Sequence, residues 1–216
     1  MRIPTILLSL SIVASTSAAQ NLPGVCAKLS DVTVGQFAEY RITIPQMGGP
    51  VDMRLAIVGT EDVGGTSFQW HEIKMDTPQG LMIMQMLVPG FPYESSDVVK
   101  MIMKGAGQPA MEMPVSMMAM IQQQGANNFA ADIVESCETA EKIGDESITV
   151  PAGSFNTEHF RITTPEKAEA WISAAVPFGI IKMNGPEGVS MELLSHGKDA
   201  MSSITETPQK MPGLRQ

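Results

Sequence analysis

The side chains of this sequence with the clearest potential for binding chemistry are its methionines. The chain has 18, and ten of them fall between residues 82 and 120. Several repeat at every second position, which on a strand places them on one face: Met82, Met84 and Met86, Met101 and Met103, and Met111 and Met113. Thioethers are soft ligands that select Cu(I). Methionine also fills irregular apolar gaps and lines adaptable binding sites.

Two observations favour the apolar interpretation of this segment over a copper site. Copper sites usually add His or Cys, and residues 82–120 contain neither. Alternate residues of one strand also lie nearly 7 Å apart, because each residue rises about 3.3 Å. We therefore predict an apolar ligand site with no metal and no other cofactor. Its predicted residues are Met82, Met84, Met86, Met118, Ile121 and Phe129.

No catalytic motif is present. The sequence lacks G-x-x-x-x-G-K-[ST], H-E-x-x-H and G-x-S-x-G. His71-Glu72 and Glu158-His159 are adjacent pairs, but neighbouring residues of a strand point to opposite faces and cannot form an acid–base pair by themselves. We expect these histidines, like His196, to be surface residues and the protein not to be an enzyme.

Cys26 and Cys137 are the only cysteines. In an oxidising compartment an even pair predicts a disulfide, with two buried free thiols as the alternative. The bridge would close a loop of about 110 residues, which the chain-entropy model equates with roughly 4 to 5 kcal/mol of stabilisation. The spacing is unlike that of a metal finger or a thiol–disulfide oxidoreductase.

The N-terminus has the three parts of a secretory signal peptide. Arg2 is followed by an apolar run at 3–13 and by small residues at 14–19. This pattern predicts cleavage after Ala19 and export to the periplasm or the extracellular space. No later run of about 18 apolar residues exists, so we expect no transmembrane segment.

The charge balance bears on possible partners. The formal net charge is −9, and no basic stripe is visible, so nucleic acid is not an expected partner. An apolar small molecule or a lipid is compatible with the composition. The oligomeric state is not indicated.

Period-2 alternation and Gly-rich turns predict antiparallel strands in both halves of the chain. The expected strands are 37–44, 53–57, 67–75 and 81–88 in the first half. In the second half they are 147–150, 156–163, 168–174, 180–183, 189–194 and 202–205.

The middle of the chain changes to helical spacing. Pro114 suits a first helical turn and Gly125 a C-terminal cap, so helices are expected at 115–124 and 128–136. We predict an α+β, mainly β fold: a single curved antiparallel sheet (a half-barrel) with a helical insert at about 114–136 packed on its concave face. The expected organisation is a signal peptide at 1–19, one domain at 20–207 and a flexible tail at 208–216.

Five short motifs carry a resemblance to a known group of proteins. They are GQFAEY at 35–40, VPAGSF at 150–155, WIS at 171–173, VPFGIIK at 176–182 and MEL at 191–193. In this order they resemble exported bacterial proteins of unknown function, which are similar in fold to the lipoprotein carriers (LolA/LolB-type). The resemblance implies a curved antiparallel sheet wrapped on a helical plug, and no catalytic residues.

These observations lead to one expected function and two alternatives. We expect an exported, non-enzymatic binding or carrier protein for an apolar ligand such as a lipid or acyl chain, because a concave sheet face and a Met-rich segment can enclose a flexible guest. The alternatives are soft-metal (copper) binding by the Met-rich segment and an envelope structural or protein-interaction module.

Overall fold

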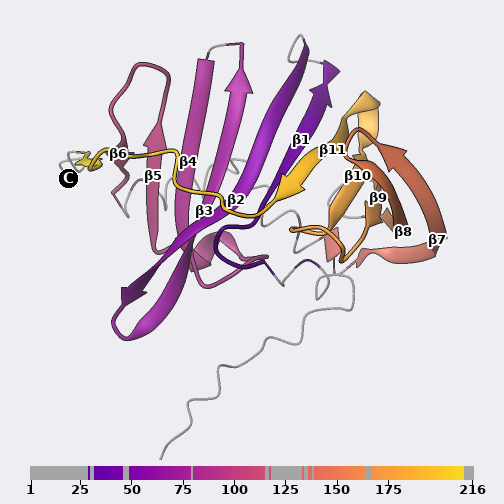
Figure 1. Cartoon of the computed structure of the whole chain (residues 1–216), viewed down its shortest axis with the longest axis horizontal. Helices are drawn as coiled ribbons and strands as arrows, with labels where there is room; N and C mark the ends of the chain where they lie inside the picture. The colour runs from indigo at the N-terminus through magenta and orange to yellow at the C-terminus, as the bar shows by residue number, and fades with distance from the viewer. Residues whose placement is uncertain are drawn as a thin grey trace, which may run out of the picture.

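A computed structural model of the chain describes residues 32–45, 49–78, 80–114, 139–163 and 167–211, together with five single residues: Leu29, Met117, Ile133, Ser136 and Cys137. These residues form one open sheet of twelve strands in the order β12-β6-β5-β4-β3-β2-β1-β11-β10-β9-β8-β7 (Figure 1). Two short 3-10 turns, η2 (Ser95–Asp97) and η3 (Pro186–Gly188), lie in connections.

The first half of the chain supplies one side of the sheet as successive antiparallel neighbours. These strands are β1 (Phe37–Ile44), β2 (Gly49–Val63), β3 (Thr66–Thr77), β4 (Gly80–Val88), β5 (Lys100–Lys104) and β6 (Met111–Glu112). The turn between β2 and β3 is Gly64-Gly65, and both glycines have positive φ. Such a conformation is readily adopted only by residues without a Cβ, which explains the glycine pair.

The second half supplies the other side in the same meandering way. Its strands are β7 (Glu141–Val150), β8 (Gly153–Ile162), β9 (Ala168–Ile172), β10 (Ile180–Asn184) and β11 (Ser190–Gly197). The two halves join where β1 pairs with β11, with Tyr40 opposite Leu193. At the far edge β12 (Gln209–Lys210) runs parallel to β6.

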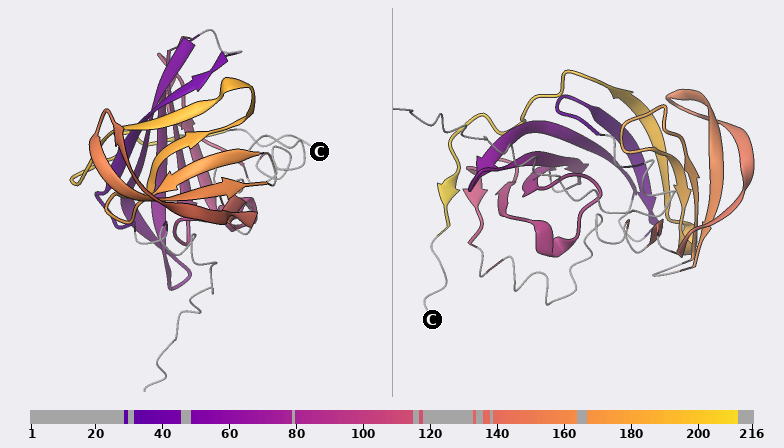
Figure 2. Two further views of the ribbon diagram at one scale, coloured as in Figure 1. Left: turned by 90° about the vertical axis from the view of Figure 1, so that its right-hand side faces the viewer. Right: turned by 90° about the horizontal axis from the view of Figure 1, so that it is seen from below.

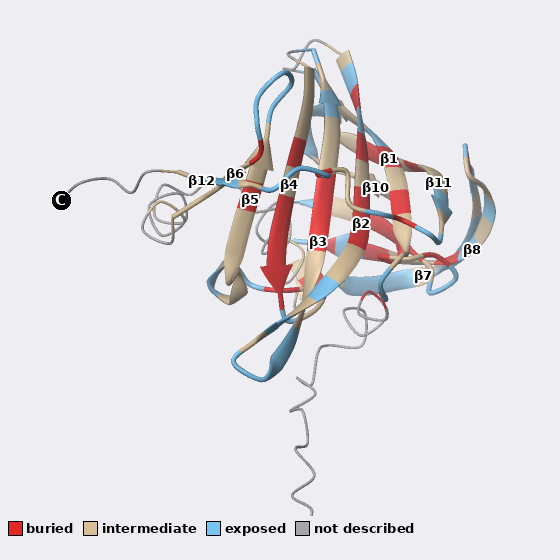
Figure 3. Ribbon diagram, turned by 60° about the vertical axis from the view of Figure 1, so that its left-hand side comes forward, coloured by how far each residue is buried: buried red, intermediate tan, exposed pale blue. Residues whose placement is uncertain are grey.

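The sheet curls on itself, as the view from below shows (Figure 2). Alternate residues of the central strands form the main core on its inner, concave face. Leu55 and Ile57 of β2 and Tyr40 of β1 are fully buried there. Burying one such side chain contributes about 1.5 to 3 kcal/mol. Buried positions accordingly run across the middle of the sheet (Figure 3).

The last described residues cross the outer face of the sheet, and we call residues 198–211 the C-terminal strap (Figure 1). Near its start, the Ala200 N–H donates to the Gly35 carbonyl at 2.7 Å. Ser203 then donates twice to the buried Glu72 carboxylate, from its backbone N–H at 2.8 Å and its hydroxyl at 2.7 Å. Gln85 donates to the same carboxylate at 2.7 Å. Glu72 is thus held by neutral donors.

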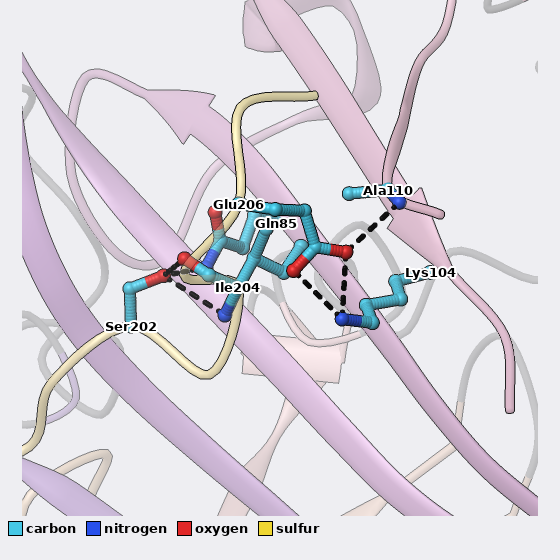
Figure 4. A network of polar contacts seen from close by, with 6 residues as sticks. All are labelled: Gln85, Lys104, Ala110, Ser202, Ile204 and Glu206. Carbon is cyan, nitrogen blue, oxygen red and sulfur yellow. Dashed lines mark hydrogen bonds and ion pairs between the residues drawn. The ribbon is translucent and has the colours of Figure 1, made fainter. Parts of the chain in front are cut away.

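The strap continues through a small apolar cluster. It also takes part in a polar network, which Figure 4 shows. Ile204 packs with Ile83, Ile102 and Ala110. Beyond it, the Glu206 carboxylate accepts from the Lys104 ammonium at 2.8 Å and from the Ala110 N–H at 3.2 Å. The strap therefore seals the outer face of β3–β6.

The predicted α+β class is wrong. The described elements are strands and two 3-10 turns, and no helix of seven or more residues and no helical insert is shown. The predicted helices at 115–124 and 128–136 fall on a segment of which only Met117, Ile133 and Ser136 are described. No helix in the described part of the chain is long and apolar enough to cross a bilayer.

Three local expectations also need correction. β7 begins at Glu141, six residues before the predicted strand, because an edge strand exposed to water needs no apolar alternation. Residues 202–205, expected as a strand, form part of the strap without ladder pairing. Gln209 and Lys210, expected in a flexible tail, pair with β6.

Candidate functional site

The predicted methionines of β4 lie together on the concave face. Met84 packs at the edge of the main core, and Met86 is buried within it. Met82 shares their face by alternation. The other three predicted residues, Met118, Ile121 and Phe129, lie outside the described residues. The predicted pocket between this strand and two helices therefore lies partly outside the described residues.

Strand pairing brings the methionines of β4 beside methionines of neighbouring strands, an arrangement that spacing along the sequence did not reveal. Met82 is opposite Met75, which is opposite Met53, so one row of three crosses β4, β3 and β2. A second row, across β4, β5 and β6, consists of Met84, Met103 and Met111. We call these the methionine rows. Directly opposite residues have Cβ atoms about 4.5 to 5.5 Å apart, closer than alternate residues of one strand.

A half-open apolar cavity lies at the other half of the sheet. This cavity of about 160 Å³ is lined from β8–β10 by Phe160, Ile162, Ala170, Ile172, Ile180 and Met183. The wall is completed by Leu29, Ile133, Ser136, Cys137 and Ala140. Met82, Met84 and Met86, the predicted ligand residues that the structure describes, do not line it, so the candidate site lies at a different part of the sheet from these methionines.

The cavity follows from residue sizes on one face of two paired strands. Phe160 lies opposite Ala170, and Ile162 lies opposite Ala168. A small residue opposite a large one leaves space that the rest of the core does not fill. Alternation in the sequence could have identified this apolar face. It could not have located the gap, because the gap depends on which residues are paired across strands.

Cys137 is buried in the cavity wall and is not a free thiol. Its predicted partner, Cys26, lies outside the described residues. The pairing of the two cysteines stays a prediction.

A polar cleft adjoins the cavity, and Ile172 belongs to the walls of both. The cleft has a volume of about 510 Å³ and is lined by Asp145, Glu146 and Glu158 together with Ser147, Asn156, Thr157, Ser173 and Ala174. Lys142 donates to Asp145 at 2.7 Å and to Glu158 at 3.0 Å. These hydrogen bonds raise the pKa of Lys142. The cleft therefore has more negative than positive side chains.

His159 and Trp171 are stacked on the opposite face of β8 and β9, with ring centroids 4.3 Å apart. The Glu146 carboxylate holds both rings: it lies 2.9 Å from His159 Nδ1 and accepts from Trp171 Nε1 at 2.5 Å. His159 alternates with Glu158 and Phe160, so its ring faces away from the cavity. This arrangement positions two rings and does not place His159 beside the candidate site.

His71 is fully buried, and the expectation of a surface histidine is wrong for this residue. Its ring stacks on Phe178 with centroids 5.5 Å apart and meets the edges of Phe91 and Tyr93. Its Nδ1 lies 3.0 Å from the Tyr93 hydroxyl. Burial lowers the pKa of His71 to about 3, so the ring is neutral at neutral pH. Phe178 belongs to the VPFG motif at 176–179. This motif is the part of the sequence that supplies the ring on which His71 stacks.

Metal chemistry based on harder ligands has no support in the described part of the chain. No group of three or more His, Cys, Asp or Glu side chains there could hold a metal ion. This finding does not bear on the methionine rows, whose thioethers are a different class of ligand.

No protein-family model and no curated protein matches this sequence. Among solved structures, the chain is similar to a protein from Parabacteroides distasonis ATCC 8503 described as a candidate lipoprotein. Their identity is 12%, the TM-score is 0.36, and the match covers 76% of this chain and 96% of the other.

It is also similar to a candidate exported protein with a YmcC-like fold from Bacteroides fragilis NCTC 9343. Here the identity is 11%, the TM-score is 0.36, and the match covers 77% of this chain and 97% of the other. Likenesses at this level assign neither a family nor an activity to the chain.

Proposed function

We propose that the chain is an exported, non-enzymatic protein that binds an apolar ligand in the cavity beside β8–β10. The supporting observation is the cavity itself, about 160 Å³ in volume with almost exclusively apolar walls. An engineered apolar cavity of about 150 Å³ is large enough to bind benzene. Export is proposed on the basis of the signal-peptide pattern at residues 1–19.

The cavity volume limits the size of the buried part of the ligand. Sites for whole drug-sized molecules have volumes of about 300 to 1,000 Å³. This cavity therefore suits one apolar moiety, such as the end of an acyl chain, with the rest of the ligand outside it. A binding or carrier role agrees with such partial enclosure, because the ligand can leave without unfolding the sheet.

Filling the cavity tests the proposal. We expect Ala170→Leu to occupy the space opposite Phe160 and to abolish binding of 1-decanol, used as an uncharged apolar probe. A ligand at 100 times its Kd stabilises the folded state by about 2.7 kcal/mol. We therefore expect 1-decanol to raise the Tm of the unsubstituted protein and not that of the variant, as measured by differential scanning calorimetry.

The matched control is Ala175→Leu, at an exposed position between β9 and β10. This control should keep the full response to 1-decanol. The proposal is overturned if 1-decanol leaves the Tm of the unsubstituted protein unchanged, or if it stabilises all three proteins equally.

A second candidate function, at a separate site, is Cu(I) binding by the methionine rows. Cross-strand pairing favours it, because each row brings three thioethers from three adjacent strands to one face. The objection that one strand spaces its ligands too widely does not apply to residues that are directly opposite each other.

We expect stoichiometric Cu(I) uptake by the tag-free protein if a row chelates the ion, measured by competition with bicinchoninate under reducing conditions. The triple change Met84→Leu, Met103→Leu and Met111→Leu should then abolish uptake. Leu and Met have similar volumes, so each change should cost less than about 1.5 kcal/mol of stability. Met201→Leu, at a side chain that is 79% exposed, is the control. Uptake that survives the triple change would exclude this row.

A further inference from the structure

We infer that the half-buried members of the methionine rows form an oxidation site, at which hypohalous acid converts thioethers to sulfoxides while the sheet stays folded. This activity is independent of the apolar cavity beside β8–β10, and it does not require Cu(I) binding by the rows. We call these residues the half-buried methionines: Met75, Met82, Met84, Met103 and Met111.

Methionine occupies most positions on the inner face of three neighbouring strands. Met82, Met84 and Met86 alternate along β4, Met101 and Met103 along β5, and Met111 lies in β6. Leucine has a similar volume and better-defined rotamers, so it specifies a packed face more strictly. The apolar cavity lies beside other strands, so lining it does not account for these methionines. A face built from methionine here therefore points to the chemistry of its sulfur.

Burial divides the methionines of the sheet into reachable and protected groups. Met53, Met86 and Met191 are 4%, 2% and 2% exposed and lie within the main core, and we call them the core methionines. The half-buried methionines are on the inner face but remain in contact with solvent. A small oxidant can therefore reach the half-buried methionines from water, whereas packing shields the core methionines.

The surroundings of the half-buried methionines can accept the oxygen atom that a sulfoxide adds. Met84 lies opposite Met103, and Met103 lies opposite Met111. Their thioether side chains are flexible, so one can shift when its neighbour becomes larger and polar. The sulfoxide oxygen can also keep contact with water at a half-buried position, which avoids the cost of burying an unpaired polar group. Oxidation at these positions is thus compatible with a folded sheet.

The oxidation is a two-electron reaction of the thioether with hypochlorous acid. The sulfur attacks the chlorine and displaces hydroxide, and water then displaces chloride and supplies the sulfoxide oxygen. Each HOCl therefore gives one sulfoxide, one chloride ion and one proton. The net charge of −9 disfavours an anionic oxidant but not an uncharged one. The described part of the chain has no free thiol that would compete for the oxidant.

Stepwise titration of the tag-free, metal-free protein with hypochlorous acid tests the inference. Peptide mass spectrometry locates each sulfoxide, and circular dichroism follows the sheet. We expect sulfoxides at the half-buried methionines, and at the 79% exposed Met201, before any forms at the core methionines. The circular dichroism spectrum should be unchanged at that stage.

Two sets of substitutions test whether position in the sheet determines the reaction. The triple change Met84→Leu, Met103→Leu and Met111→Leu should lower the number of sulfoxides by three per molecule. The matched control changes the three core methionines to leucine. It removes the same number of thioethers and should leave the number of sulfoxides in the folded protein unchanged. The mapping in the unsubstituted protein depends on neither variant.

The inference is supported if the half-buried methionines are oxidised in the folded protein and the two triple variants differ as expected. Sulfoxide confined to Met201 would overturn it. Loss of the strand signal before the half-buried methionines have reacted would also overturn it, as would an equal fall in sulfoxide number in both triple variants. None of these outcomes bears on the apolar cavity, which Ala170→Leu tests separately.

Discussion

Acidification from pH 6.5 to pH 3 is expected to lower the free energy of unfolding by up to about 5 kcal/mol through His71 alone. The folded-state pKa of this residue is lowered from 6.5 to about 3 because the ring is completely buried. Above pH 6.5 the ring is neutral in both the folded and the unfolded chain, so its titration does not lower the free energy of unfolding. As the pH falls below 6.5, the unfolded chain binds a proton that the folded chain cannot, until the folded-state pKa is reached.

The surroundings of His71 explain why the folded state does not accept the proton. Phe91, Tyr93 and Phe178 surround the ring, and the Tyr93 hydroxyl is its hydrogen-bond partner. The described contacts of the ring thus include no carboxylate that could stabilise an imidazolium. Protonation would place an unpaired charge among aromatic rings, which is among the costliest changes in a protein interior.

Urea unfolding followed by circular dichroism at several pH values between 7 and 3 measures this effect. His71→Gln is the comparison, because glutamine is polar and does not titrate. The variant should be less stable than the unsubstituted protein at pH 7, but its stability should fall less steeply between pH 6.5 and pH 3. Identical slopes for the two proteins would contradict the assignment, since the carboxylates titrate in both.

Reduction of the predicted disulfide is expected to have an effect of similar size. A bridge between Cys26 and Cys137 closes a loop of about 110 residues, so its loss should cost roughly 4 to 5 kcal/mol. Oxidised and reduced protein should therefore differ by this amount in urea unfolding. The double variant Cys26→Ala with Cys137→Ala should match the reduced protein and should not respond to reductant.

Thiol counting provides an independent check of the bridge. The denatured, unreduced protein should show no free thiol with Ellman's reagent. Two titrating thiols would refute the pairing. Alanine is the appropriate replacement because Cys137 lies in the apolar cavity wall, where a serine hydroxyl would introduce a separate desolvation cost.

The strands with one buried face were the part of the fold that the sequence could predict. Residues 37–44 were expected as a strand, and β1 has those bounds, with Ala38 and Tyr40 fully buried on one face. Met53, Leu55 and Ile57 of β2 follow the same rule. Period-2 alternation is informative here because one face meets the core and the other does not.

Other elements depend on partners that are distant in the sequence. β12 is a two-residue strand that exists because β6 lies beside it, and local pattern cannot predict it. The strap carries Ser203 to Glu72, 131 residues away. The predicted site was likewise incomplete: the methionines of β4 share a face, but the cavity depends on the pairing of Phe160 with Ala170.

The strap also determines when the outer face of the sheet can be covered during synthesis of the chain. Hairpins such as β2–β3 can form as soon as their own residues have been synthesised, since their contacts are local. Glu72 cannot receive its donors from Ser203 until the final stretch of the chain has emerged. Until then its carboxylate and the outer side chains of Ile83 and Ile102 stay in contact with water. A chain released before residue 198 therefore lacks the segment that covers this part of its outer surface.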